Sequence, residues 1–173
     1  LTEFAGFDDA ALHWAAQGIS GNLPHVFRAY LGQMGHARGA LFEGSAADAD
    51  ELLAYRPAAE KIMRRCGVES FLNDDSLVFM LHQGYTFCYF QTEHEIIYDS
   101  PVFQYTECDP APRRIAPGFA ELLDAELALM EETNRLERAS GGYFITVEHG
   151  FSRRTYPALS DGPRPLDTPD DLI

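Results

Sequence analysis

Residues 76–90 decide the fold, and they read SLVFMLHQGYTFCYF. Two runs rich in aromatic and β-branched residues, Ser76–Leu81 and Tyr85–Phe90, are separated by three residues that include Gly84. Such runs favour strands, and a short connection that contains glycine favours a hairpin. Aromatic residues occupy every second position of the later run, and the positions between them are mostly apolar. We therefore expect a β-hairpin that is covered on both faces.

Two further strands are expected outside this hairpin. Pro101–Thr106 follows a polar, acidic loop, Gln91–Ser100, and its proline stands at the first position, where a strand tolerates it. The stretch Asp109–Pro112 then interrupts the strand pattern. Tyr143–Val147 is predicted to form the last strand.

Apolar residues at helical spacing predict four helices. They cover Ala10–Gln17, Pro24–Met34, Ala58–Cys66 and Pro117–Glu137. The third of these is expected to start after Pro57 and to stop at Gly67, because proline disrupts the interior of a helix and glycine often ends one.

Length and composition are those of an ordinary globular domain. The chain has 173 residues, of which 46% are hydrophobic and 23% charged. A chain of this length buries roughly 70% of its unfolded surface, so one core is feasible. We predict a single domain over residues 1–155 and an irregular tail, rich in proline and aspartate, over residues 156–173. The N-terminal residues lack a signal-peptide pattern, and no run approaches the ~18 apolar residues of a membrane span.

The chain is strongly acidic. It has 27 acidic and 13 basic residues, with a formal net charge of -14, and no Lys or Arg lies between Arg65 and Arg113. Nucleic acids and anionic membranes are bound through Lys and Arg, so both are disfavoured as partners. A basic partner protein is favoured, because opposite electrostatic fields speed encounter. The alternative is that the acidity serves solubility alone.

The cysteine pattern indicates neither a zinc ribbon nor a thioredoxin-type motif. Cys66, Cys88 and Cys108 are odd in number and widely spaced, and no CxxC pair is present. Cys88 lies within an apolar strand run and is expected to be a small core side chain. A reduced, cytoplasmic setting is the simplest interpretation.

No catalytic constellation is visible in the sequence. Residues 94–98 begin like the zinc motif HExxH, but Tyr98 takes the place of the second His. His82 and His149 could converge in space, although histidines at turns are usually ordinary surface residues. Two pairs of adjacent carboxylates are more typical of solvated loops than of a divalent-cation site: Asp74-Asp75 and Asp170-Asp171. Since GxSxG, P-loop and GxGxxG patterns are absent too, we expect no catalytic residues, no metal and no cofactor.

Four segments, taken in order, resemble a known superfamily. They are Leu23-Pro24 opening a helix that reaches Tyr30-Leu31, the hairpin Leu77–Phe90, the strand segment Asp99–Tyr105, and Phe119–Leu123 in the long helix. This order is similar to that of the SUKH superfamily, which includes fungal cell-wall-synthesis regulators and many bacterial immunity proteins. The likeness is greatest to a bacterial subgroup with a His-Gln-Gly-Tyr-x-Phe-x-Tyr-Phe hairpin and a following Ser-Pro-Val strand. It covers residues 18–132.

The resemblance implies an α+β fold, with a mostly antiparallel β-sheet packed against several helices. It also implies a protein-binding role without catalysis. Many bacterial members resemble inhibitors of cognate toxin domains, frequently nucleases or deaminases. Immunity surfaces diverge with their partners, so the resemblance assigns no binding residue here.

We predict that the partner is bound by an acidic, aromatic surface. Its six residues are Glu93, Glu95, Tyr98, Asp99, Glu107 and Asp109. A toxin that acts on nucleic acid tends to have a basic cleft, and acidic side chains would pair with the Lys or Arg residues there. Tyr98 could supply a buried anchor. The alternative is a solvated loop beside a sheet edge.

Two other classes of function remain open. One is an intracellular regulator or scaffold that binds housekeeping proteins, as the fungal relatives suggest. The other is a small-molecule sensor or enzyme with a pocket between sheet and helices, which would need convergent polar groups that the sequence does not display.

Overall fold

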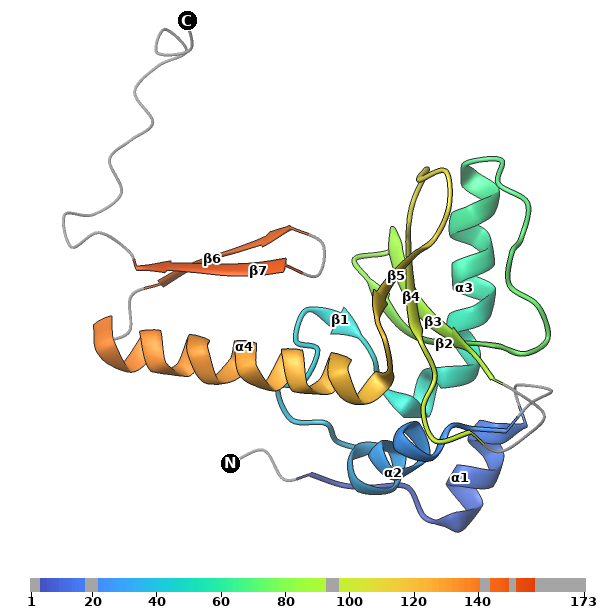
Figure 1. Ribbon diagram of the computed structural model, residues 1–173, viewed down its shortest axis with the longest axis horizontal. Coiled ribbons are helices and arrows are strands. Elements are labelled where there is room, and N and C mark those ends of the chain that lie inside the picture. The colour runs from blue at the N-terminus through green and yellow to red at the C-terminus, as the bar shows by residue number, and fades with distance from the viewer. Residues whose placement is uncertain (1–3, 18–21, 93–96, 141–143, 150–151, 158–173) are drawn as a thin grey trace, which may run out of the picture. The chain divides into compact units, whose positions relative to one another are not determined.

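The protein has an α+β fold, as predicted. The computed structural model describes residues 4–17, 22–92, 97–140, 144–149 and 152–157, and the chain divides into two compact units, Leu1–Leu127 and Ala128–Ile173. The first unit contains a five-stranded antiparallel sheet in the order β1-β2-β3-β4-β5 (Figure 1). The prediction of a single domain over residues 1–155 stays a prediction.

The central strands of the sheet are the predicted ones. They are β2 (Ser76–His82), β3 (Thr86–Gln91) and β4 (Val102–Thr106). Each pairs antiparallel with the next, and a bulge interrupts the register of β2 between Val78 and Met80.

The two edge strands were not predicted. They are β1 (Ser45–Ala46) and β5 (Arg113–Ala116). β1 has only two residues, and β5 begins with two exposed arginines, so neither carries the alternating apolar pattern of a half-buried strand. Pairing with β2 and β4 defines them as strands.

The helices lie close to their predicted positions, with one correction. They are α1 (Asp9–Ala16), α2 (His25–Met34), a 3-10 turn η1 (Ala49–Glu51), α3 (Leu52–Arg65) and α4 (Phe119–Ser140). α3 begins six residues earlier than predicted and contains Pro57. Its first turns bury Leu52 and Tyr55, and the Tyr55 hydroxyl donates a hydrogen bond to the carbonyl oxygen of Asp48 (3.0 Å). This packing offsets the roughly 3 kcal/mol that an interior proline costs.

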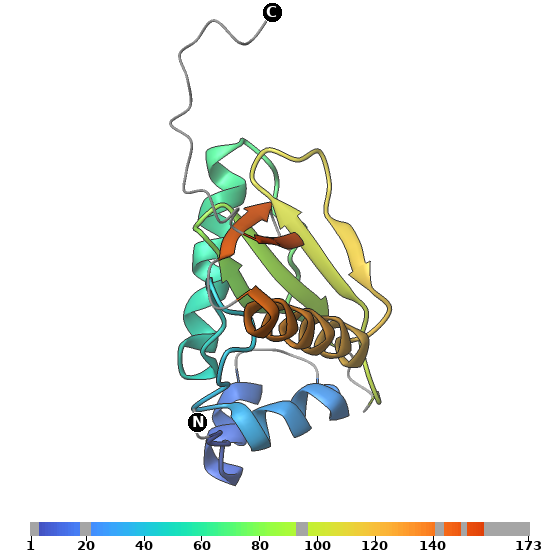
Figure 2. The same ribbon diagram turned by 90° about the vertical axis from the view of Figure 1, so that its left-hand side faces the viewer.

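Both faces of the sheet are covered, as expected from the hairpin sequence. On one face Phe27 of α2 and Phe119 of α4 pack against Phe79 and Phe90, with ring centroids 5.0 to 6.4 Å apart. Helix α3 lies on the other face (Figure 2). There Phe71 packs against three aromatic side chains: Phe87, Tyr89 and Tyr105. Burying each large apolar side chain contributes roughly 1.5–3 kcal/mol, so these clusters form the core.

The cysteines include one feature that the sequence did not predict. Cys88 is fully buried in β3, as predicted, and burial raises the pKa of its thiol well above the ordinary value. Cys66 and Cys108, for which the sequence indicated no pairing, form a disulfide with their Cα atoms 5.2 Å apart. The two residues are 42 positions apart, so only the three-dimensional path of the chain brings them together.

The second unit holds the C-terminal part of α4 and a two-stranded hairpin. Its strands are β6 (Phe144–His149) and β7 (Ser152–Pro157), paired antiparallel from Phe144 opposite Pro157 to His149 opposite Ser152. β6 was predicted and β7 was not. β7 extends two residues into the predicted tail, whose other residues lie outside the described part of the chain. Within the described residues, no helix has both the length and the apolarity to cross a membrane.

Candidate functional site

The turn that leads into β4, residues 97–100, is held at its start by helix α2. The N–H groups of His25 and Val26 donate to the carbonyl oxygens of Ile97 (3.1 Å) and Tyr98 (3.0 Å). The first amides of a helix have no acceptor within the helix itself. Pro24 offers no capping side chain here, so the carbonyls of the turn satisfy these donors and fix its backbone.

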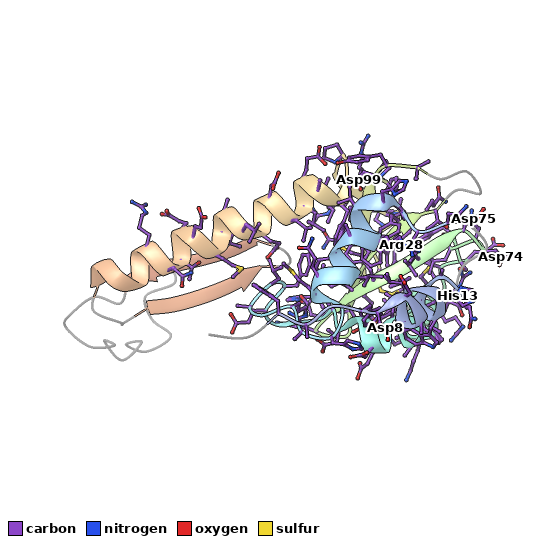
Figure 3. The ribbon with its side chains drawn as sticks, turned by 90° about the horizontal axis from the view of Figure 1, so that it is seen from below. Asp8, His13, Arg28, Asp74, Asp75 and Asp99 are labelled. Carbon is purple, nitrogen blue, oxygen red and sulfur yellow. A yellow bond between two sulfur atoms is a disulfide. The ribbon has the colours of Figure 1, made fainter. Side chains whose placement is uncertain are left out.

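Asp99 holds the same turn at its end by capping helix α4. Its Oδ1 atom accepts from the N–H of Phe119 (2.9 Å), and its Oδ2 atom accepts from the N–H of Ala120 (3.0 Å). Figure 3 shows Asp99 at the start of α4. A Cβ atom on Gly118 would lie 2.4 Å from Oδ2, so the close approach of the carboxylate requires glycine there. A negative charge at a helix N-terminus also interacts favourably with the helix dipole.

Tyr98 projects from this doubly anchored backbone into solvent. We call residues 97–100 the Tyr98 turn. The tyrosine is 77% exposed, compared with 57% for Phe4 and 46% for Leu127. The next residue but one, Ser100, is buried and donates from its hydroxyl to the carbonyl oxygen of Gln91 (2.8 Å). The structure thus presents a large, amphipathic side chain on a backbone that is already ordered.

Glu107 lies at the opposite end of β4, in a different environment. Arg65 Nε lies 2.8 Å from Glu107 Oε1, and Arg65 Nη2 donates to the carbonyl oxygen of Gly84 (2.7 Å). The adjacent Cys108 is bonded to Cys66 at the end of α3. We call Arg65, Cys66, Gly84, Glu107 and Cys108 together the disulfide end.

The residues predicted as one acidic surface therefore fall into separate groups. Tyr98 and Asp99 precede β4, whereas Glu107 and Asp109 follow it, and the five residues of β4 span roughly 17 Å. Glu93 and Glu95 lie outside the described residues. Asp99 caps a helix and Glu107 pairs with an arginine, so both carboxylates serve the fold. Of the four described residues, Tyr98 has the side chain that is largely exposed and to which we assign no structural role.

Other polar residues offer less. His82 is buried, and its Nδ1 atom lies 2.9 Å from the hydroxyl of Ser45 on the neighbouring strand. His149, its proposed companion, belongs to the second unit. Within the described residues, no group of three or more His, Cys, Asp or Glu side chains could hold a metal ion.

A small cavity lies between α2 and the sheet, but it has the character of a core defect. Its lining is apolar or aromatic, with Phe27, Leu31, Phe42 and Phe79 among the side chains around it. Tyr30 also lines it, and burial raises the pKa of this phenol to about 12, so the hydroxyl stays protonated. The convergent polar groups that a small-molecule site needs are not among its lining residues.

Comparison with known proteins adds no relative from which a site could be transferred: no protein-family model matches the chain, and no curated protein matches its sequence. The candidate site rests on the geometry of the described residues.

Proposed function

We propose that the protein is a SUKH-like, non-enzymatic binding module that acts in the cytoplasm as an immunity protein. Its partner would be a cognate toxin domain with a basic surface, of the kind that acts on nucleic acid. One observation carries the proposal: Tyr98 is 77% exposed on a backbone that two helix N-termini hold in place.

An aromatic side chain in this position is suited to anchoring a protein partner. Tyrosine is enriched among the few interface residues that dominate binding energy, because its ring buries a large area and its hydroxyl can still find a hydrogen bond. Ordering a loop on binding costs free energy. The hydrogen bonds from α2 and α4 remove much of that cost before the partner arrives.

The charges of the first unit favour a basic partner. Several of its arginines are engaged by acidic side chains of the same chain: Arg38 with Asp48, Arg56 and Arg64 with Glu60, and Arg65 with Glu107. Each pair cancels one positive and one negative charge, so the field is set by the excess of acidic residues, which gives the chain a formal net charge of -14. This negative charge would speed the encounter with a basic protein.

The test starts with capture of the partner from the native source. The tagged full chain should retain one basic polypeptide in stoichiometric amount, released at high salt, and the purified chain should inhibit the activity of that polypeptide. Tyr98→Ala should then weaken the affinity by roughly 30-fold, as expected for an interface hot spot of about 2 kcal/mol. The matched control is Leu127→Ala, which also removes an exposed apolar side chain and should leave the affinity unchanged.

Two results would contradict this proposal. Equal affinity of Tyr98→Ala and the unmodified chain would remove the Tyr98 turn from the interface. Capture of several housekeeping proteins, none of them inhibited, would favour the alternative of an intracellular regulator or scaffold.

The acidic part of the predicted surface has a separate test. Glu93→Gln with Glu95→Gln removes two charges and leaves the Asp99 cap of α4 intact. This variant should bind the captured polypeptide more weakly and with a flatter salt dependence. The control, Glu69→Gln with Glu131→Gln, removes the same charge from two exposed positions elsewhere in the chain. Equal effects of the two variants would show that overall charge alone matters.

A further inference from the structure

We propose that the Cys66–Cys108 disulfide is a reversible thiol–disulfide site that controls the order of residues 107–112. In the oxidised protein the bond ties this segment to the end of α3, and in the reduced protein the segment is released. The switch does not depend on the proposed function. An effect of the switch on partner binding rests on the proposed function, because Glu107 and Asp109 belong to the predicted surface.

The two bonded cysteines are accessible to solvent, and the third cysteine is not. Cys108 is exposed and Cys66 is half-buried, whereas Cys88 is fully buried. Thiol–disulfide exchange requires a thiolate to reach one sulfur of the bond, so accessibility decides which cysteines react. The buried Cys88 thiol serves as an internal control in the same molecule.

The backbone at Cys108 favours opening. Its φ angle is 63°, in the left-handed region that residues other than glycine rarely occupy. The N–H of the next residue, Asp109, donates to the carbonyl oxygen of Thr106 (2.9 Å), which closes a tight turn. Breaking the bond to Cys66 removes the covalent restraint on this strained residue, so the turn can relax.

The remaining restraints on the segment are weaker than the disulfide. The N–H of Glu107 donates to the carbonyl oxygen of Tyr85 (2.7 Å), which continues the β3–β4 pairing for one residue. The Arg65–Glu107 ion pair is partly solvated, with 46% and 29% of the two side chains exposed. Exposed ion pairs contribute little to stability and are screened by salt. We therefore expect release to begin at Cys108 and to spread toward Pro112.

The exchange needs a dithiol as the reductant. One thiolate of the dithiol attacks Sγ of Cys108, the Cys66–Cys108 bond breaks, and Cys66 leaves as a thiolate. The second thiolate of the dithiol then attacks the mixed disulfide at the reductant sulfur, so that Cys108 leaves as a thiolate and the reductant closes its own disulfide. Two electrons pass to the protein, and each cysteine thiolate takes up one proton.

The experiment compares the oxidised full chain with the chain reduced by dithiothreitol under native conditions. Thiol labelling followed by mass spectrometry should modify Cys66 and Cys108 of the reduced chain and leave Cys88 unmodified. Hydrogen exchange of residues 107–112 should become at least ten times faster, whereas that of β3 should stay unchanged. Removing the reductant in air should restore the slow exchange.

A variant separates the disulfide from the ion pair. Arg65→Gln keeps the disulfide and removes the pairing with Glu107, so residues 107–112 of the oxidised variant should exchange nearly as slowly as in the unmodified chain. Three results would overturn the proposal: unchanged exchange of residues 107–112 after reduction, labelling of Cys88 with loss of protection in β3, or fast exchange in oxidised Arg65→Gln. All three results are measured on the protein without a partner, so failure of the switch is distinguishable from failure of the proposed function.

Discussion

The two ends of β4 are held by different chemistry. Before the strand, the Tyr98 turn is fixed by hydrogen bonds to the first amides of α2 and α4. After the strand, the disulfide end is fixed by a covalent bond and a partly solvated ion pair. Hydrogen bonds to helix N-termini do not respond to thiols, whereas a disulfide does. Reduction should therefore leave the Tyr98 turn in place and act on the disulfide end alone.

The helix termini explain why the two ends differ. The Tyr98 turn faces helix N-termini, whose free N–H groups need acceptors, and the turn supplies them. The disulfide end meets the C-terminus of α3, where two carbonyl groups accept hydrogen bonds from the residues that follow the helix. Gly67, at φ 65°, and Val68 donate back to the carbonyl oxygens of Arg64 and Met63, the pattern of a Schellman motif. The segment that follows β4 is attached to this capped terminus by the Cys66–Cys108 bond and by the Arg65–Glu107 ion pair.

Removing the disulfide should give the largest loss of stability. Closing a loop across a separation of 42 residues stabilises the folded state by about 4 kcal/mol through the entropy of the unfolded chain. The left-handed conformation of Cys108 offsets roughly 1–3 kcal/mol of this. We expect Cys66→Ser with Cys108→Ser to lower the free energy of unfolding by about 2 kcal/mol, measured by urea denaturation. Dithiothreitol should destabilise the unmodified chain equally and leave the double variant unchanged, and any response of that variant to dithiothreitol would contradict this assignment.

Removing the cap of α4 should give a smaller loss that is independent of redox conditions. Asp99→Ala leaves the first amides of α4 without their carboxylate and should cost about 1 kcal/mol in the free energy of unfolding. Gly118→Ala should cost a similar amount, because its Cβ displaces the same carboxylate. The two losses should not add in the double variant, since both remove one interaction. Additive losses would show that Gly118 acts separately from the cap.

The sequence predicted those parts of the fold that depend on local patterns. The hairpin follows from two apolar runs around Gly84, and the end of α3 follows from Gly67, whose left-handed conformation a helix terminus uses. The start of α3 was wrong because Pro57 is a strong local signal that the burial of Leu52 and Tyr55 overrides. β5 was missed because its strand character comes from pairing with β4.

The candidate site was less predictable, because its contacts join residues distant in sequence. The Asp99 cap reaches 20 positions to Phe119, and the Arg65–Glu107 ion pair reaches 42. Nothing local marks Asp99 as a capping residue or Cys66 as a partner of Cys108. The sequence places Tyr98 in an acidic, aromatic surface. The structure distinguishes it from the other residues of that surface, because its side chain is exposed on an anchored turn.

Removing the ion pair at the disulfide end should have the smallest effect. Arg65→Gln loses the contact with Glu107 and one donor to Gly84, but water can replace both at these partly solvated groups. The free energy of unfolding should fall by about 0.3 kcal/mol at low salt, and the difference should vanish near 1 M salt, where the Debye length is roughly 3 Å. Paired urea titrations at the two salt concentrations measure it, with Glu107→Gln as the matched variant. A salt-independent loss above about 1 kcal/mol would make Arg65 a second structural lock beside the disulfide, and reduction alone would then be too weak to release the segment.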